Sequence, residues 1–220
     1  MSSLEIQNLS FRYSNNQPWI VRNFSFEAEK GDIVAVQGPS GSGKTTFLYL
    51  LCGVIPKIIK GEFGGKIKVM NENIENLSLP QIAPKLSLMM QETELQLSFP
   101  SVEQELAFAP ENLKLTPSEI ENRIDDALTL LQIKSLRYEE TATLSFGQKK
   151  LVAFASILTL SPQIFLLDEP TSGLSSYYIQ IIINVISKLS HEGKTIFIAN
   201  PSPELLKISN KVIDLDNLQE

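Results

Sequence analysis

The chain has very little of the chemistry on which secreted proteins and metalloenzymes rely. Its 220 residues contain a single cysteine, Cys52, so no disulfide can form within the chain, and this suits a reducing cytoplasm. The only histidine, His191, lies in the polar stretch HEGK, and no group of His, Cys, Asp and Glu has the spacing of a metal site. These shortages argue against a disulfide-stabilised fold and against a transition-metal centre.

Long apolar runs and excess positive charge are also missing. No apolar stretch approaches the roughly 20 residues that a membrane-spanning helix needs, and the first residues show no signal-peptide pattern. The net charge of −6 argues against nucleic acid as a partner, because phosphate backbones attract basic surfaces. We therefore expect a chain that is soluble on its own and that reaches a membrane only through partner proteins.

What the chain does have is a glycine-rich loop, GPSGSGKTT, at residues 38–46. It fits the phosphate-loop pattern G-x-x-x-x-G-K-[ST], with an apolar run before it and a helical pattern after it. The backbone N–H groups of such a loop, together with the positive end of the helix dipole, bind a polyphosphate. A chance match is the alternative, and the placement between a strand and a helix argues against it.

Individual roles follow from the chemistry of this loop. Lys44 is expected to reach the β- and γ-phosphates, and the Thr45 hydroxyl is expected to hold Mg²⁺. The residues that we expect to bind the phosphates are Gly38, Ser40, Gly41, Ser42, Gly43, Lys44, Thr45 and Thr46.

Two carboxylates end the apolar run IFLLDE at residues 164–169. Ligands of α/β sheets bind at the carboxyl ends of the strands, so these acids stand where a ligand is expected. Asp168 would bind Mg²⁺, directly or through water, and Glu169 would polarise the water that attacks the γ-phosphate. A strand ending in two acids is common by itself, and only the preceding phosphate loop makes it informative.

A third motif, LSFGQ at residues 144–148, runs into an apolar helical pattern. Ser145 and Gly147 at a helix N-terminus can form a second anion site, although an ordinary capped helix is the simpler interpretation. Because the chain already has one phosphate loop, a second anion site suggests a sandwich. In it, the LSFGQ of one molecule covers the nucleotide of another.

The hydrophobic periodicity predicts an α/β fold. Strand patterns occupy the first third of the chain and return at residues 164–167 and 195–199, with a helix near 177–189 between them. We predict one domain over residues 1–220, in which 1–91 and 161–220 form a β-rich core and about 92–160 form an inserted α-helical subdomain.

Two N-cap signals support the helical assignment. Ser101 is followed three residues later by Gln104, which is the sequence pattern of a capping box. Thr116, Pro117 and Glu119 repeat the signal as N-cap, first helical residue and third helical residue. Both patterns predict helices that begin directly after the cap.

Four features in this order, GPSGSGKTT, Gln91 after a buried strand, LSFGQ and IFLLDEP, resemble the ATP-binding-cassette (ABC) ATPases over essentially the whole chain. The resemblance implies an ABC-type P-loop NTPase core with an N-terminal antiparallel β region, and ATP and Mg²⁺ as cofactors. It implies that Tyr13 stacks on the adenine and that Gln91 touches Mg²⁺ and senses a transmembrane partner. It further implies that two cassettes close head to tail over two ATP molecules, each covered by the other chain's Ser145, Gly147 and Gln148.

A narrower resemblance follows Gln91. The run QETELQL, followed by SVEQELAFAPENL, is similar to energy-coupling-factor and cobalt- or nickel-importer ATPases, which commonly read QNPDDQL and TVEEEVAFGPEN. The match is incomplete, because Leu95 replaces the second acid and Ala109 replaces a glycine. The resemblance implies a pair of ATPase subunits with a transmembrane coupling protein and a substrate-capture subunit. We expect Glu92 and Glu94 to face basic residues of that coupling protein.

Two departures from the family pattern bear on mechanism. Ser175 stands after TSGL where the family has an aspartate, and Pro201 stands where the family has a histidine that contacts the γ-phosphate. Proline has neither a side-chain donor nor an N–H. Losing one such donor typically costs roughly 10²–10³ in rate, so hydrolysis at this chain's own site would be slowed. The alternative is that Asn200 or Ser202 replaces the histidine.

The sequence thus predicts the ATP-binding and ATP-hydrolysing subunit of an energy-coupling-factor-type importer for a vitamin or metal ion. Glu169, Lys44 and Gln91 would be catalytic, and Thr45, Gln91 and Asp168 would hold the metal. The subunit would lie peripherally on the cytoplasmic face of the membrane, paired with a second ATPase chain that differs from it. The alternatives are a catalytically weakened, nucleotide-gated subunit and an ABC ATPase without a transport role.

Overall fold

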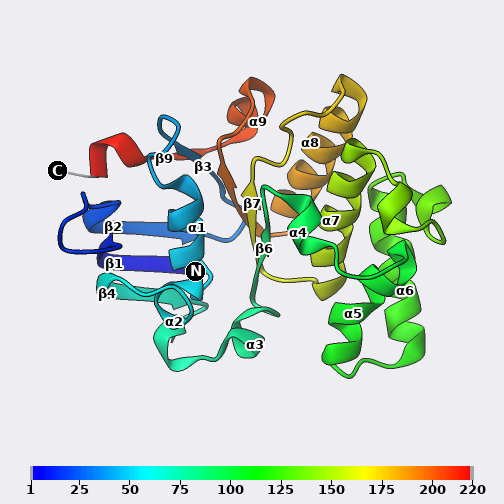
Figure 1. Ribbon diagram of the computed structural model, residues 1–220, viewed down its shortest axis with the longest axis horizontal. Coiled ribbons are helices and arrows are strands. Elements are labelled where there is room, and N and C mark those ends of the chain that lie inside the picture. The colour runs from blue at the N-terminus through cyan, green and yellow to red at the C-terminus, as the bar shows by residue number, and fades with distance from the viewer. Residues whose placement is uncertain (1, 219–220) are drawn as a thin grey trace.

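The computed structural model describes residues 2–218, and the N-terminal strands form an antiparallel sheet (Figure 1). Buried residues alternate along the first strand, and the alternation changes between Ile6 and Leu9, where the pairing register shifts. Asn8 lies at this shift with a φ of 49°. The strands pair in the order β2-β1-β4-β5 and comprise β1 (Ser2–Arg12), β2 (Val21–Glu29), β4 (Glu62–Val69) and β5 (Glu72–Asn73).

The continuous apolar runs form a second, parallel sheet through the middle of the molecule. Its strands pair in the order β6-β7-β8-β3-β9 and comprise β3 (Ile33–Gln37), β6 (Leu86–Met89), β7 (Ile164–Asp168), β8 (Thr195–Ala199) and β9 (Lys211–Asp214). Its central strands, β7, β8 and β3, are buried over nearly their whole length, as expected for a sheet that is covered on both faces.

Helices connect the strands of the parallel sheet. The longest of these helices, α8, has Ser175 as its N-cap, and the Ser175 hydroxyl accepts from the Tyr178 N–H. The connecting helices are α1 (Lys44–Leu51), α2 (Val54–Lys57), α3 (Leu79–Ile82), α8 (Ser176–His191) and α9 (Pro203–Ile208). Short 3₁₀ turns occur at Ile74–Asn76, Lys134–Leu136, Thr141–Thr143 and Leu215–Leu218.

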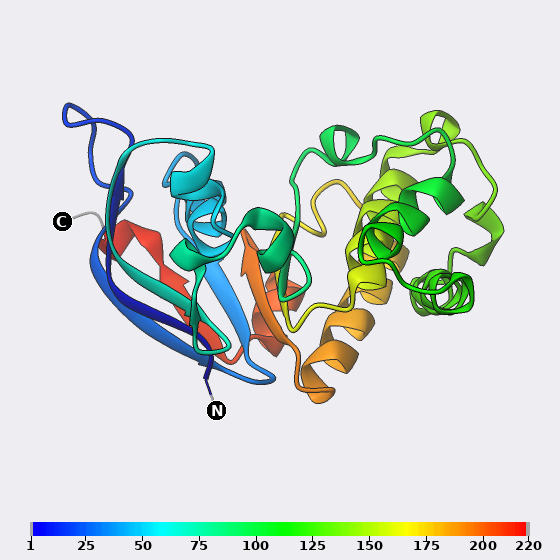
Figure 2. The ribbon, with the colours of Figure 1, turned by 90° about the horizontal axis from the view of Figure 1, so that it is seen from below.

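The helical segment lies on the side of the parallel sheet opposite the antiparallel strands, and both chain ends lie on the strand side (Figure 2). It comprises α4 (Thr93–Gln96), α5 (Val102–Asn112), α6 (Pro117–Leu130) and α7 (Phe146–Leu160). Thr116 and Glu119 form the predicted capping box. Ser101 caps α5 as predicted, but the Gln104 side chain accepts from the Ser101 hydroxyl and not from its N–H, so only half of that box is present.

Two hydrophobic clusters meet at the parallel sheet. In β7, Phe165 and Leu167 pack into the cluster of α5 to α8, whereas Ile164 and Leu166 pack into the cluster of the antiparallel sheet and α1. Because successive strand residues point to opposite faces, one strand joins both clusters. The helical segment is thus attached to the sheet by a continuous apolar contact. The subdomain boundaries near residues 92 and 160 stay a prediction.

The predicted α/β class, with an N-terminal antiparallel sheet, a parallel core and an inserted helical segment, is confirmed. Sequence reasoning missed β9 and α9, which are short and follow an exposed turn at Asn200. Cys52 is buried at the end of α1, where burial raises the pKa of its thiol to about 11. None of the helices in residues 2–218 has the length and apolar character needed to cross a membrane.

Gly65 lies in β4 beside the register shift of β1, and we expect any substitution there to destabilise the fold. Its φ is +94°, and a Cβ there would come within 2.5 Å of the Asn8 carbonyl oxygen. We expect Gly65→Ala to lower the free energy of unfolding by about 2 kcal/mol or more, because it combines backbone strain with a clash. Gly64→Ala is the matched control, since nothing lies within 4 Å of a Cβ there. Equal urea midpoints for the two variants would contradict this account.

Candidate functional site

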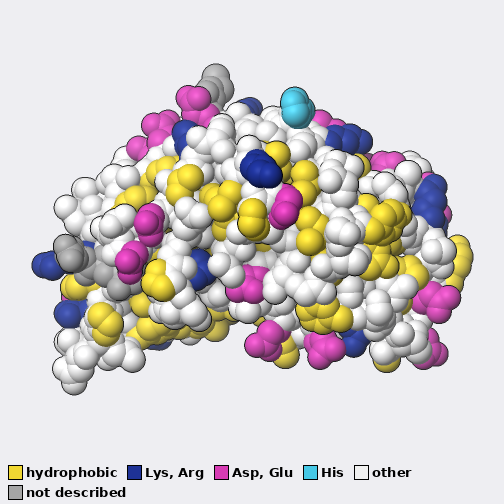
Figure 3. All heavy atoms as spheres, turned by 90° about the horizontal axis from the view of Figure 1, so that it is seen from above, with side chains coloured by type: hydrophobic (Ala, Val, Ile, Leu, Met, Phe, Trp, Pro, Cys, Tyr) yellow, Lys and Arg dark blue, Asp and Glu magenta, His cyan; other side chains and the backbone are white. Residues whose placement is uncertain are grey.

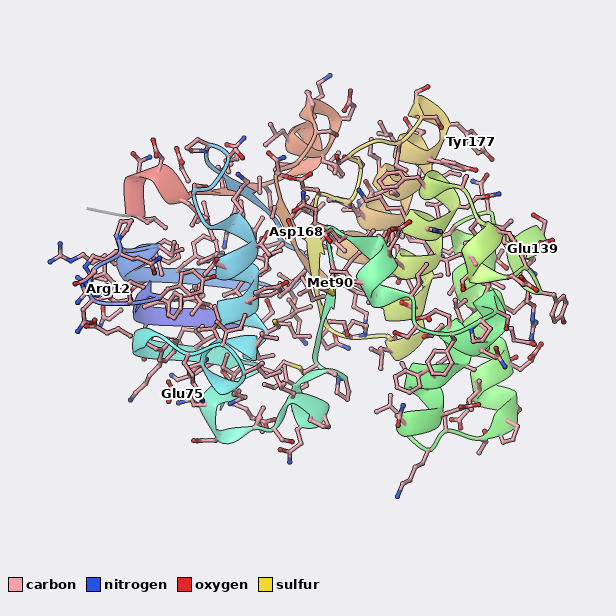
Figure 4. The ribbon with its side chains drawn as sticks, viewed as in Figure 1. Arg12, Glu75, Met90, Glu139, Asp168 and Tyr177 are labelled. Atoms are coloured by element: carbon pink, nitrogen blue, oxygen red, sulfur yellow. The ribbon has the colours of Figure 1, made fainter. Side chains whose placement is uncertain are left out.

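The motif residues gather at the carboxyl edge of the parallel sheet. The glycine-rich loop follows β3, Asp168 ends β7 with Glu169 directly after it, and Gln91 follows β6 after Met90. The neighbouring strands run parallel, so their carboxyl ends meet at the same edge. Figure 4 places Asp168 and Met90 near the centre of the molecule, between the strands and the helical segment, while Arg12 lies at the far end of the antiparallel sheet.

The Lys44 side chain folds back onto the glycine-rich loop. Its Nζ donates to the carbonyl oxygens of Gly38 and Pro39, both at 2.8 Å. Gly43 is the N-cap of α1 with a φ of 94°, and a Cβ there would lie 2.4 Å from Ile20, so no larger residue fits. The loop therefore holds a cation and the positive end of a helix together, which is the arrangement that binds phosphate.

Thr45, in the first turn of α1, meets Asp168 at the end of β7. The Thr45 hydroxyl donates to Asp168 Oδ2 at 2.6 Å. The Asp168 carboxyl is buried, and burial raises its pKa, although the hydrogen bond from Thr45 opposes the shift. A cation beside this carboxylate would favour its charged form, so the carboxylate and the hydroxyl are well suited to a divalent metal ion.

Gln91 lies at the same place. It lines a cavity of about 110 Å³ together with Thr45 and Asp168, and Tyr49, Leu88, Met90, Glu92 and Leu95 form the rest of the wall. All three polar groups supply oxygen ligands of the kind that Mg²⁺ prefers. The structure thus brings together the three residues predicted to hold Mg²⁺, and their role as ligands stays a prediction.

Tyr13 lies against the start of α1. Its hydroxyl shares a hydrogen bond of 2.7 Å with the Thr46 hydroxyl, and its ring meets Phe11 edge to face at 5.1 Å. Tyr13 is 39% exposed, so part of the residue is accessible to a ligand. The predicted adenine contact is compatible with this placement, while the hydroxyl bond to Thr46 was not foreseen.

The LSFGQ motif begins α7. Ser145 Oγ accepts from the Gln148 N–H at 3.3 Å, and Gln148 Oε1 accepts from the Ser145 N–H at 2.8 Å, so the two residues form a capping box. A Cβ at Gly147 would lie 2.9 Å from the Tyr178 ring, which explains the glycine. Among the residues that the structure describes, no hydrogen bond joins Ser145 or Gln148 to Lys44 or Glu169.

Two lysines after this motif have roles that the sequence did not reveal. Lys149 forms a 2.9 Å ion pair with Glu94, which lowers the pKa of that carboxyl. Lys150 is buried, and its Nζ donates to the Ser172 carbonyl oxygen at 2.9 Å. Burial lowers the pKa of the Lys150 amine. A pair of lysines opening an apolar helix was the available signal, because a buried lysine needs a partner.

Glu94 therefore has its basic partner within the chain, which changes the expectation that it faces a coupling protein. Its side chain remains 71% exposed in spite of the ion pair with Lys149. Glu92 is exposed at the start of α4, and no ion pair involving it occurs within residues 2–218. Of the two acids, Glu92 is thus the one that is free to face a partner.

The fold and these contacts define a P-loop nucleotide-binding protein. The family model described as ABC transporter matches residues 21–172. The energy-coupling factor transporter ATP-binding protein EcfA of Methanococcus maripaludis is 37% identical over 218 residues, covering 96% of this chain and 75% of that protein. A protein of Pyrococcus horikoshii, provisionally named an ABC transporter ATP-binding protein, is 35% identical and covers 98% of this chain and 77% of its own length.

A solved structure agrees with these relatives. The structure of cbiO1 from Clostridium perfringens, part of the ABC transporter complex cbiONQ, superposes with a TM-score of 0.83 at 28% identity. It covers 97% of this chain and 84% of that one. The chain therefore belongs to the ABC transporter family of ATP-binding proteins, and its relatives include energy-coupling-factor ATPases.

Lys44→Ala should abolish measurable ATP binding. The substitution removes the charge that is predicted to face the phosphates, and charge-assisted hydrogen bonds of this kind account for roughly 10²-fold or more in affinity. Lys60→Ala is the matched control, because Lys60 Nζ also donates to two carbonyl oxygens, those of Pro56 and Lys57, away from the loop. Titration calorimetry with ATP would measure both variants. Micromolar affinity in Lys44→Ala would refute the role given to the loop.

Proposed function

We propose that this chain is the ATP-hydrolysing subunit of an energy-coupling-factor-type importer. It would bind MgATP, close head to tail against a second cassette, and drive uptake of a vitamin or metal ion through a transmembrane coupling protein and a substrate-capture subunit. The chain would lie peripherally on the cytoplasmic face of the membrane. The EcfA relatives and the similarity of the segment after Gln91 support this assignment.

The observation that carries the proposal is the separation of the two anion sites. Lys44, Thr45 and Asp168 meet at the edge of the parallel sheet, whereas Ser145 begins a helix that has no hydrogen bond to Lys44 or Glu169 among the described residues. A helix N-terminus of this kind attracts phosphate. A second cassette in head-to-tail orientation would supply the missing half of each site.

The surface is compatible with such a pairing. The loop between β3 and α1 opens toward the top of Figure 1, and Figure 3 views the molecule from that side. Hydrophobic side chains lie between charged ones across this face, and neither sign of charge dominates it. Such a mixture is usual for partners that associate and separate repeatedly.

Within the site, Lys44 would hold the β- and γ-phosphates and Tyr13 would lie against the adenine. The glycines and hydroxyls of residues 38–46 would surround the phosphates with N–H and O–H donors. Thr45, Gln91 and Asp168 would hold Mg²⁺, which neutralises phosphate charge when bound. Glu169 would orient the attacking water and accept its proton.

Hydrolysis at the ATP site that contains this chain's own Lys44, Asp168 and Glu169 is proposed to be slow. Pro201 follows Asn200 at the end of β8, and proline has no hydrogen to donate to the γ-phosphate. Removing one preorganised donor costs about 2.7–4 kcal/mol of transition-state stabilisation. The same observation favours a second candidate function, a nucleotide-gated subunit whose partner performs most of the hydrolysis.

The pairing is proposed to be with a different chain. In a homodimer, both sites would lack the histidine contact and both would meet Ser175 in place of aspartate. Ser175 caps α8, as an aspartate there would, so the helix start is preserved while the charge is lost. A partner cassette that has both the histidine and the aspartate of the family would restore the histidine contact at its own site. This chain would complete that site with Ser145 and Gly147.

Assembly should therefore raise the rate of hydrolysis. We expect the purified chain to hydrolyse ATP slowly and the chain mixed with its partner cassette to exceed the sum of the two separate rates, by about tenfold or more. Ser145→Arg would block the composite site and serve as the control, because it should remove the increase without changing this chain's own ATP affinity. If the chain alone turns over ATP as fast as the assembled transporter, the heterodimer proposal fails.

The acids of α4 provide a test of membrane docking. Reversing Glu92 and Glu94 to arginine should release the chain from membranes that contain the coupling protein, because it would set like charges against each other. Glu94→Gln controls for loss of the Lys149 ion pair, and Glu139→Arg controls for charge reversal on the helical side (Figure 4). Co-sedimentation is the measurement, and ATP affinity is measured on the same samples because Glu92 lines the cavity of the predicted metal site. Undiminished co-sedimentation of the double variant would count against docking here.

A further inference from the structure

Glu169 and Asn200 are neighbours at the edge of the parallel sheet. The strands that precede them, β7 and β8, are paired with Asp168 opposite Ala199, so the next residue of each strand leaves the sheet at the same level. Both residues have left-handed backbone conformations, with φ of 50° at Glu169 and 51° at Asn200. The Glu169 N–H also donates to the Ala199 carbonyl oxygen at 3.1 Å. Strand pairing and backbone conformation thus place the two side chains together.

The two side chains are joined directly. Asn200 Nδ2 donates to Glu169 Oε1 at 3.0 Å. Left-handed conformations are uncommon outside glycine and cost roughly 1 kcal/mol or more, and they concentrate where function requires a fixed geometry. An amide nitrogen carries two hydrogens, and Glu169 is the one acceptor that it has among the described residues. Asn200 is otherwise exposed.

We propose that Asn200 is a positioning residue for ATP hydrolysis, which fixes the Glu169 carboxylate by this bond. The inference rests on the proposed function, because it assigns a role within the same site. It also gives the chain a donor at the strand end where Pro201 offers none. Hydrolysis at this chain's own site is then slow but retained, and it depends on Asn200.

The step that Asn200 would assist is the transfer of the γ-phosphoryl group to water. The water oxygen forms a bond to the γ-phosphorus while the bond from that phosphorus to the β,γ-bridging oxygen breaks, and ADP leaves with the bond's electron pair. The Glu169 carboxylate takes the proton that the water loses and later returns it to solvent or phosphate. A carboxylate on a short flexible side chain must be held to accept this proton, and an amide donor to one oxygen leaves the other free.

Three substitutions at Asn200 can change the side-chain amide without disturbing the fold, because they tolerate its left-handed backbone. Asp, Gly and His all tolerate such a conformation better than most residues. Asn200→Asp has the same shape but no hydrogen to donate, and Asn200→Gly has no side chain. Asn200→His carries its Nδ1 the same number of bonds from the backbone as Asn200 Nδ2, so it can restore the donor. Asn71 is the matched control, since it is exposed in a turn with a φ of 68°.

The experiment is single-turnover hydrolysis of MgATP by the purified full chain, with ATP affinity measured on the same samples. Asn200→Asp and Asn200→Gly should lower the rate constant about 10- to 100-fold, the range of one hydrogen bond to a charged group. ATP affinity should stay within about twofold, and Asn200→His should recover most of the rate. Asn71→Asp and Asn71→Gly should match the unsubstituted chain.

The other outcomes would refute the inference, the proposed function or both, as follows from each result. Wild-type rates in Asn200→Asp and Asn200→Gly would refute the inference and leave the proposed function standing. A loss of ATP affinity equal to the loss of rate would assign Asn200 to binding and not to positioning, which also refutes it. An unsubstituted chain that binds MgATP and never hydrolyses it, even with a partner cassette, would refute the inference together with the hydrolytic role in the proposed function, and would leave the nucleotide-gated subunit as the remaining candidate. Failure of the unsubstituted chain to bind ATP would refute the proposed function itself.

Discussion

The hydrogen bond between Thr45 and Asp168 depends on the order of the parallel strands. Thr45 follows β3 and Asp168 ends β7, and β8 lies between these strands. The two side chains meet only because all three strands run in the same direction and end at one edge. Burial of Asp168 makes its charge costly until a cation or phosphate-bound metal compensates. The order and direction of the strands therefore decide which side chains meet at this edge, and the chemistry of those side chains then decides what they can bind.

The helix that begins with LSFGQ is attached to two different loops of the site. Lys149 pairs with Glu94 on α4, which follows Gln91, and Lys150 donates to the Ser172 carbonyl oxygen in the loop after the acids. Gln96 adds a third link, because its side chain accepts from the Met90 N–H and donates to the Ala153 carbonyl oxygen in α7. A shift of α7 would therefore move both loops. This is a physical route by which the closure proposed above would reach the residues that are proposed to hold Mg²⁺.

Much of the fold and part of the site could be predicted from the sequence because their signals are local. The glycine-rich loop, the acids after an apolar run and the Thr116 cap each depend on residues that are close in sequence. The bond between Asn200 and Glu169 could not be predicted, because it requires the neighbouring positions of β7 and β8 and left-handed residues at both strand ends. The partner of Glu94 was missed for the same reason, since Lys149 is distant in sequence.

The state of Cys52 has a practical consequence for studying motion in this protein. The thiol is 7% exposed and its pKa is raised to about 11, so almost none of it is thiolate at neutral pH. Alkylating reagents attack the thiolate, and this sulfur should remain unmodified in the folded protein. A single cysteine introduced on α4 or α7 could thus carry a spectroscopic label without removal of the natural one. The chain is already a suitable background for measuring distances between the helical segment and the strands as ATP binds.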